Sequence, residues 1–207
     1  MGGRLAEKRE AIMRGARSVF GRDGYTRTSI DAIAKEAGVS TRTIYNHFES
    51  GKAELFRLIV EEGAAQIHDA QLDVIDRWLR KVTDLEEDLV DFGRAWVEPL
   101  GTFPDHFALV RQLRAEVGHL PPELLRAWEE AGPLRVENAL ADRFRNLAEE
   151  GLLRTDDPRQ AASHFLQLIS GEIIDRSYYG ALPLPPEVVT RLITAGVRAF
   201  LHGYLPR

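Results

Sequence analysis

The sequence predicts an all-α protein, and three patterns in its 207 residues support this fold class. Apolar residues recur three or four positions apart through most of the chain, as they do along the buried face of a helix. Glycines and prolines divide these stretches into segments of helical length, with prolines near several proposed starts, where a missing N–H does little harm. No segment alternates apolar and polar residues for long enough to predict a strand.

The first two predicted helices are short and lie within residues 5–37. The first ends between Gly21 and Gly24, because glycine tolerates the left-handed conformation that often closes a helix. The second begins in "TSID", where Thr28 is the predicted N-cap and Asp31 completes a capping box. Its apolar stripe ends before Gly38. The stripes of the two helices contain these residues: Leu5, Ile12, Ala16, Val19, Phe20, Ile30, Ile33, Ala34 and Ala37.

A third short helix follows in "VSTRTIYNHF", residues 39–48, with Ser40 as its predicted cap. Ile44 and Phe48 are four residues apart and therefore share one apolar face. The pair of helices within 28–48, joined by a tight turn at Gly38, has the layout of a helix-turn-helix, whose second helix enters a DNA major groove.

The remainder predicts a helical body. A long helix runs from Lys52 to about residue 80, and later helices follow where Pro and Gly divide the chain. Their predicted ranges are 84–100, 105–118, 122–131, 133–150, 158–180 and 186–203.

Composition limits the function classes that fit. Cysteine is absent, which excludes disulfides and thiolate metal sites. No apolar run approaches the ~18 residues that a membrane span needs, and the charged start lacks the apolar core of a secretory signal. These features predict a cytoplasmic protein without a membrane partner. Residues 1–52 contain ten Lys or Arg and six Asp or Glu, a net charge of +4, whereas the remainder carries −9. This asymmetry favours a basic module joined to an acidic body.

The outward side of the third helix suits duplex DNA. Arg42 has a planar fork that can bind guanine O6 and N7 or a phosphate, and Asn46 shares its face. Thr41 can meet a base edge or a thymine methyl group. Phosphate contacts are predicted for a larger set, because these residues carry donors or lie at a helix start that favours anions. The set comprises Thr28, Ser29, Thr43, Tyr45, His47 and Lys52.

Ordinary surface chemistry gives an alternative for each of these residues. Two short capped helices occur in many proteins, so the spacing alone leaves a generic helix pair open. Arg42 could form a surface ion pair, which is usually worth only ~0–1 kcal/mol. His47 could be a solvated surface residue, and Tyr45 could be half-buried packing.

Residues 11–56 resemble the N-terminal DNA-binding domain of the TetR family of bacterial transcriptional regulators. The resemblance lies in the Phe20–Gly24–Tyr25 corner, the "TSI" helix start, "IAKEAGVS", the "TIYNHF" run and the following lysine with "ELF". One spacing departs, since Lys52 follows Phe48 by four residues where many members have three. Residues 111–140 are more loosely similar to the body of the AefR-like subset.

The resemblance implies a DNA-binding domain over 1–51 and a ligand-binding and dimerisation domain over 52–207. Members of the family are homodimers whose last two long helices usually pair with their copies as a four-helix bundle. The expected function is a repressor that binds a palindromic operator and releases it when a small, largely hydrophobic effector binds. An activator, or a regulator that needs no ligand, would use the same DNA-binding head.

The body offers candidates for the effector pocket and the dimer interface. Aromatic residues between helices often line small-molecule sites, although at helical spacing they are more often core. The pocket candidates are Trp96, Phe103, Phe107 and Trp128. The segment "FLQLISGEIIDRSYY" is apolar enough for an interface, or alternatively for the subunit's own core. The interface candidates are Phe165, Leu168, Ile169 and Ile173.

The sequence contains no complete motif for a metal site, a phosphate-binding loop or a catalytic site. Glu116 and His119 are three residues apart, a spacing that could bind a metal, but a pair without a third ligand favours a helix cap or a surface pair. "ESGKAE" resembles the end of a phosphate-binding loop, yet Asn46 stands where the leading glycine is needed. No H-E-x-x-H or G-x-S-x-G sequence occurs. We therefore expect no cofactor, no metal and no catalytic site, and a helical enzyme is a remote alternative.

Overall fold

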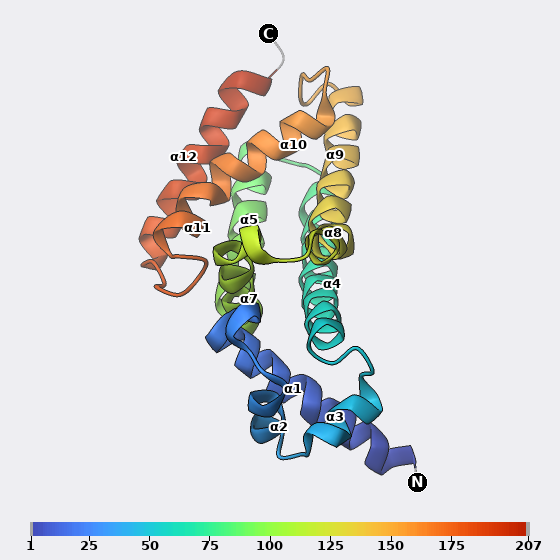
Figure 1. The fold of residues 1–207 in the computed structure, drawn as a ribbon. Coiled ribbons are helices and arrows are strands. Elements are labelled where there is room, and N and C mark those ends of the chain that lie inside the picture. Colours follow the sequence, from blue (N-terminus) through green and yellow to red (C-terminus); the bar gives the residue numbers. More distant parts are fainter. Residues whose placement is uncertain (1, 206–207) are drawn as a thin grey trace. The chain divides into compact units, whose positions relative to one another are not determined.

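The computed structural model describes residues 2–205, with side chains from residue 5 onward, and its regular structure is helical throughout (Figure 1). The predicted all-α fold class is confirmed. The chain divides into two compact units: the first holds residues up to 65 together with 105–131, and the second holds 66–104 together with 132 onward. No helix within residues 2–205 has the length and apolar character needed to cross a bilayer.

The first unit begins with the three helices of the predicted head, the long α1 (Gly2–Arg27) and the short α2 (Ile30–Ala37) and α3 (Thr41–His47). α1 and α2 pack closely, because a Cβ at Gly15 would lie 3.0 Å from the Cβ of Ala37. α1 contains a break at Gly24, whose φ of 78° and ψ of 176° are not helical. The last residues of α1 therefore form a separate turn that leads into α2.

The first half of α4 (Lys52–Leu79), α7 (Pro104–Ala115), the 3₁₀ turn η1 (Val117–His119) and α8 (Pro122–Ala131) complete this unit. One continuous apolar core joins them to the three-helix head. Its fully or nearly fully buried members come from all of the longer elements, and include Ile12, Phe20, Ile33, Ile44, Phe48, Phe56, Leu109, Leu113 and Leu124. Thus the helix-turn-helix shares its core with α7 and α8, segments that the sequence assigned to the body.

His106 of α7 packs against α4 in the same unit. A Cβ at Gly63 would lie 2.8 Å from the His106 Nδ1 atom, so glycine at this position permits the close approach of the imidazole. Among the described residues, this buried Nδ1 atom has no hydrogen-bond partner. Glu62, the residue before Gly63 on α4, forms an ion pair with Arg17 of α1, with 2.5 Å between Nη2 and Oε2.

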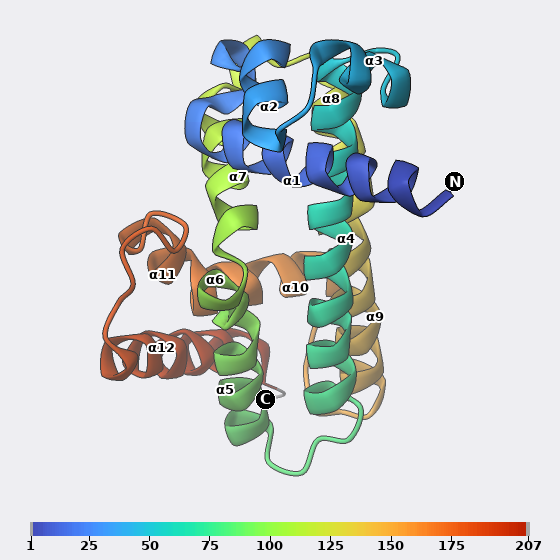
Figure 2. The same ribbon diagram turned by 90° about the horizontal axis from the view of Figure 1, so that it is seen from below.

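The second unit holds the end of α4, then α5 (Leu85–Val97), the single turn α6 (Pro99–Thr102), α9 (Pro133–Glu149) and α12 (Pro186–Tyr204). Between α9 and α12 the chain forms α10 (Pro158–Leu166), a π-helical segment η2 (Gln167–Gly171) and α11 (Glu172–Arg176). α10 packs on α9, while α12 packs on η2 and α5 (Figures 1 and 2). The core contains a chain of aromatic contacts that links Phe92, Phe144, Phe165, Phe200 and Tyr204.

Buried residues recur at steps of four through α10, η2 and α11. Phe165, Ile169, Ile173 and Ser177 are each at most 3% exposed. Backbone meets backbone where α12 crosses this segment, because a Cβ at Gly196 would overlap the Leu168 carbonyl group. The wide turn of η2 therefore lies directly against α12.

Candidate DNA-binding surface

Ile44 and Phe48 attach α3 to the first unit. Both side chains are fully buried, and the predicted apolar face of this helix is confirmed. The Phe48 backbone N–H donates to the Ile44 carbonyl at 2.9 Å and ends the helix. The guanidinium of Arg9 on α1 lies 5.3 Å from the centre of the Phe48 ring, a cation–π distance. A helix of two turns is thus held from one side only.

Local hydrogen bonds fix both ends of the turn between α2 and α3. Gly38 closes α2 with a left-handed backbone, φ 65° and ψ 34°. Ser40 is the N-cap of α3, as predicted, and its hydroxyl accepts from the Thr43 N–H at 3.1 Å. The Ser40 and Thr43 hydroxyls also hydrogen bond each other at 2.8 Å. These contacts order the first turn of α3 through hydrogen bonds within the chain itself.

The other side of α3 is open to solvent within the described structure. Arg42, Tyr45 and Asn46 are exposed, and the Tyr45 ring retains 51% of its surface. Thr41, Thr43 and His47 are half-buried at the edges of this face. The Tyr45 ring lies against Gly51, where a Cβ would stand 2.9 Å from its Cε1 atom. The structure therefore brings six of the predicted DNA-contacting residues onto one short helix.

Of the two hydroxyls predicted at the start of α2, Ser29 is the N-cap and Thr28 is not. The exposed Ser29 hydroxyl accepts from the Ala32 N–H at 3.1 Å. Thr28 is only 4% exposed, and its hydroxyl donates to the Gly24 carbonyl at 2.5 Å. Since Thr28 is buried and its donor is used, its expected phosphate contact is corrected to a structural role in the turn after α1.

Lys52 is also engaged inside the molecule. Its ammonium donates to the Tyr25 carbonyl at 3.0 Å and lies 4.5 Å from the centre of the Tyr25 ring. The side chain is half-buried. An ammonium carries three donors, and one of them is used by the Tyr25 carbonyl. The phosphate contact of Lys52 remains a prediction.

The aromatic candidates for an effector pocket fall in different units. Trp96 and Phe103 belong to the second unit, where Trp96 stacks on the buried Phe92 with 5.4 Å between ring centres. Phe107 and Trp128 belong to the first unit, and Trp128 packs against the core of the head. All four side chains are half-buried. Their assignment to a pocket remains a prediction.

The predicted interface stripe is mostly core. Phe165, Ile169 and Ile173 are at most 3% exposed within the second unit, so they cannot face a partner, and this part of the prediction is corrected. Leu168 alone of the four is exposed, at 43%. The apolar spacing of these residues therefore serves the subunit's own core.

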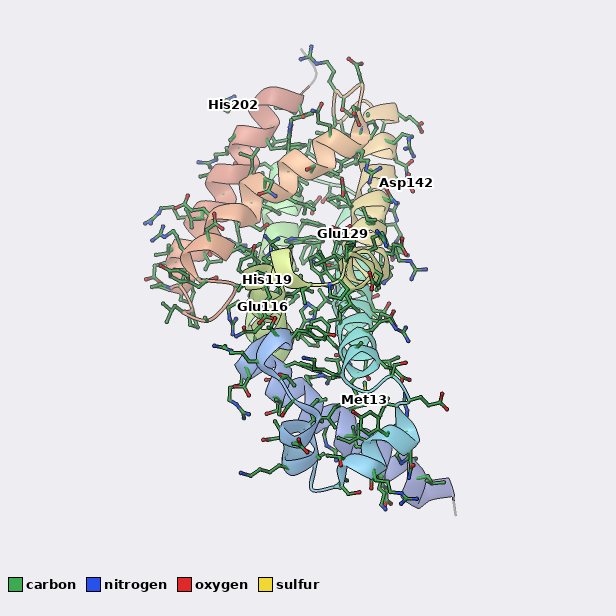
Figure 3. All side chains as sticks on the ribbon, in the orientation of Figure 1. Met13, Glu116, His119, Glu129, Asp142 and His202 are labelled. Atoms are coloured by element: carbon green, nitrogen blue, oxygen red, sulfur yellow. The ribbon has the colours of Figure 1, made fainter. Side chains whose placement is uncertain are left out.

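Glu116 makes a contact that the sequence did not indicate. Its carboxylate accepts from the backbone N–H groups of Tyr25, at 2.7 Å, and Thr26, at 3.1 Å. Figure 3 labels Glu116 and His119 on the segment that follows α7. Within the described residues no three His, Cys, Asp or Glu side chains cluster as metal ligands. Of the readings open for Glu116, the helix cap is the one that the contacts support.

Two family models match the chain. Residues 12–59 match the bacterial regulatory proteins of the tetR family, and residues 87–206 match the C-terminal domain of AefR-like transcriptional repressors. The first match covers α2 and α3, and the second covers more than half of the chain. Both models describe transcriptional regulators, and neither describes an enzyme.

Similar proteins agree with the family models. The HTH-type transcriptional repressor AcnR of Corynebacterium efficiens is 24% identical over 95% of this chain and 96% of its own length. The crystal structure of a TetR-family regulator from Mesorhizobium loti has a TM-score of 0.82 and 30% identity, over 98% of this chain and 99% of that one. The flavonoid-responsive regulator FrrA has a TM-score of 0.69 and 32% identity over the same shares of the two chains. The chain therefore belongs to the TetR family of bacterial transcriptional regulators, with an AefR-like C-terminal domain.

Proposed function

We propose that this regulator is a repressor that binds a palindromic operator as a homodimer, with α3 in the major groove of each half-site. The observation that carries the proposal is the exposed polar face of α3 opposite its two buried anchors. A dimer of such heads would place two recognition helices in successive major grooves, about 34–36 Å apart. Ser29, Thr41, Arg42, Thr43, Tyr45, Asn46 and His47 are the proposed DNA-contacting residues.

A small, largely hydrophobic molecule is the proposed effector, and its binding to the body would release the operator. The FrrA relative is named for its response to flavonoids, and its 32% identity over 98% of this chain supports an aromatic ligand class here. Moving the protein from mostly bound to mostly free requires that the effector favour one state by ~5 kcal/mol. An activator, or a regulator without a ligand, remains the alternative, because the head would be the same.

The homodimer would use surfaces that the subunit leaves uncovered. Leu168 is exposed within η2, and α12 presents the small exposed residues Ala195 and Ala199. Small residues permit two helices to approach closely, as the four-helix bundle of the family requires. We expect Ala199→Glu to convert a dimer into monomers in sedimentation velocity, whereas the exposed Arg145→Ala should leave the dimer intact. A dimer in both variants would refute this choice of surface.

The DNA-binding proposal is tested by selecting duplexes from genomic or random DNA with the purified protein. Arg42→Ala should then weaken binding to the selected operator by about 10- to 100-fold, the ~1–3 kcal/mol of a bidentate base contact, and relax preference at one base pair. Arg145→Ala, which removes the same charge from the second unit, is the control. Wild-type affinity and base preference in Arg42→Ala would exclude the recognition role, and release by hydrophobic compounds would identify the effector class.

A further inference from the structure

The turn between α1 and α2 is an unusual helix junction. Gly24 leaves the helical conformation at φ 78° and ψ 176°, and the chain resumes a single turn before Ser29 caps α2. A break of this kind starts a new turn whose first backbone N–H groups have no partner in the preceding helix. The N–H groups of Tyr25 and Thr26 are in this position. Such groups attract an anion, because they present aligned donors at the positive end of a helical turn.

Glu116 supplies that anion from 91 residues further along the chain. Its Oε2 atom lies 2.7 Å from the Tyr25 nitrogen and 3.1 Å from the Thr26 nitrogen, and its Oε1 atom lies 3.4 Å from the latter. The residue stands directly after α7, where its own carbonyl accepts from His119 at 2.7 Å and begins η1. The end of α7 is therefore joined to the end of α1 through one carboxylate.

Gly24 makes room for this contact. A Cβ at Gly24 would lie 2.6 Å from Oε1 and 2.9 Å from Cδ of Glu116, and 3.0 Å from Oε1 of Gln112. Any side chain here would displace the carboxylate, in addition to the cost of a positive φ. The positive φ and the absent side chain thus both serve the approach of Glu116.

Other contacts also hold this turn, at two of its carbonyl groups and at the Tyr25 ring. Thr28 binds the Gly24 carbonyl, and Lys52 binds the Tyr25 carbonyl. The Tyr25 ring lies 4.8 Å from Phe56 and 6.2 Å from Phe20 between ring centres. Burial raises the pKa of Tyr25 above its ordinary value, and the Glu123 carboxylate adds to this effect. The turn, held by these contacts, leads directly into α2, the first helix of the helix-turn-helix.

We infer that Glu116 is a positioning residue for DNA binding: its carboxylate on the Tyr25 and Thr26 N–H groups lets the end of α7 fix the direction in which α2 and α3 leave α1. The inference rests on the proposed use of α3 for DNA contact. By this inference the residue that follows α7 contacts the turn before α2 through hydrogen bonds. This contact adds to the apolar packing of Leu109 and Leu113 of α7 in the shared core.

The direction in which DNA affinity changes distinguishes a positioning role of Glu116 from a simple effect of its negative charge. Removing a carboxylate from a DNA-binding protein reduces repulsion of phosphate, so charge alone predicts equal or tighter binding. Loss of a positioning contact predicts weaker binding instead. A hydrogen bond to a charged group contributes more than a neutral one, so Glu116→Gln should bind DNA more weakly than the wild type. Its amide oxygen can still accept the hydrogen bonds, so it should lose less DNA affinity than Glu116→Ala.

The test compares Glu116→Ala and Glu116→Gln with Glu130→Gln, which removes the same charge from an exposed position on α8 of the same unit. The probe is a duplex selected by the wild-type full-length protein. Stoichiometric titration gives the active fraction of each preparation, and fluorescence anisotropy at several salt concentrations gives Kd for that fraction. Hydrogen exchange measured on peptides covering residues 21–30 reports the freed N–H groups in the absence of DNA.

We expect Glu116→Ala to raise the Kd of the active fraction about tenfold. The dependence of Kd on salt should not change, because no phosphate contact is lost. The backbone amides of Tyr25 and Thr26 should exchange their hydrogens faster than in the wild type. Glu116→Gln should show a smaller loss, and Glu130→Gln none. A wild-type Kd for Glu116→Ala, or a loss equal to that of Glu130→Gln, would overturn the inference alone. If the wild-type protein selects no duplex, the proposed DNA contact fails first and the inference with it.

Discussion

His106 should make the stability of the protein depend on pH in a window where ordinary surface histidines have little effect. The imidazole of this α7 residue packs against Gly63, and its buried Nδ1 atom lacks a hydrogen-bond partner among the described residues. Burial lowers the pKa of His106 from 6.5 to about 4, and the positive charge of Arg17 contributes in the same direction. The folded protein therefore holds this group in its neutral form.

The magnitude follows from proton linkage. Between pH 6.5 and about 4 the unfolded chain binds a proton at His106 that the folded chain does not, so the free energy of unfolding falls as the pH falls. The part of the free energy of unfolding that depends on neutral His106 is fully present above pH 6.5. With ~1.36 kcal/mol per pH unit, roughly 2 kcal/mol is lost between pH 7 and pH 5, and the full shift corresponds to about 3 kcal/mol.

Urea unfolding of the wild-type protein and of His106→Gln measures this contribution. Both proteins are followed by circular dichroism at several pH values from 7 to 5 and at one protein concentration, because association changes apparent stability. Other titrating groups act on both proteins, so the difference between the two curves isolates His106. We expect this difference to shift by roughly 2 kcal/mol in favour of the variant as the pH falls.

A constant difference across the range would refute the reasoning. It would mean that the imidazole is protonated as easily in the folded protein as in the unfolded chain, and therefore that its site admits water or an acceptor.

Three substitutions test other parts of the structure. Gly196→Ala should destabilise the second unit by about 2–3 kcal/mol, because its Cβ would overlap the Leu168 carbonyl in a place where backbone must move; an unchanged melting temperature would contradict this packing. Phe48→Ala should cost about 3–5 kcal/mol in urea unfolding and abolish operator binding, since it removes a fully buried anchor of α3; retained binding would show that α3 needs no such anchor. Ser40→Ala should cost about 1 kcal/mol through the lost cap and weaken operator binding severalfold, and equal affinity would indicate that DNA itself orders the first turn.

The head could be predicted from the sequence because its signals are local. Gly38, Ser40 and the Ile44–Phe48 pair each act within one turn of their own position, and the structure places all of them as expected. The one local error concerns neighbouring hydroxyls. Thr28 and Ser29 are both good N-caps by residue type, and only the break at Gly24 decides that Thr28 turns inward.

Longer-range features could not be predicted for physical reasons. An apolar stripe such as Phe165, Ile169 and Ile173 has the same spacing whether it meets its own subunit or a copy. The carboxylate of Glu116 meets N–H groups 91 and 90 residues away, and no sequence pattern links such distant partners. Similarly, the apolar core shared by the head with α7 and α8 depends on tertiary packing, which no local helix signal indicates.

The π-helical turn of η2 has a consequence for insertions and deletions. Residues four apart drift by about 40° per step around a regular α-helix, so Phe165 and Ser177 would be separated by about 120° and could not both face the same core. A π turn accommodates one additional residue and removes about 100° of this drift, which explains why Phe165, Ile169, Ile173 and Ser177 are all buried. Deleting a single residue from 167–171 would restore a regular helix and leave the Ser177 end facing the same core, because eleven residues bring an α-helix back to within about 20° of the Phe165 direction. Inserting one residue there would instead rotate the Ser177 end by about 100°.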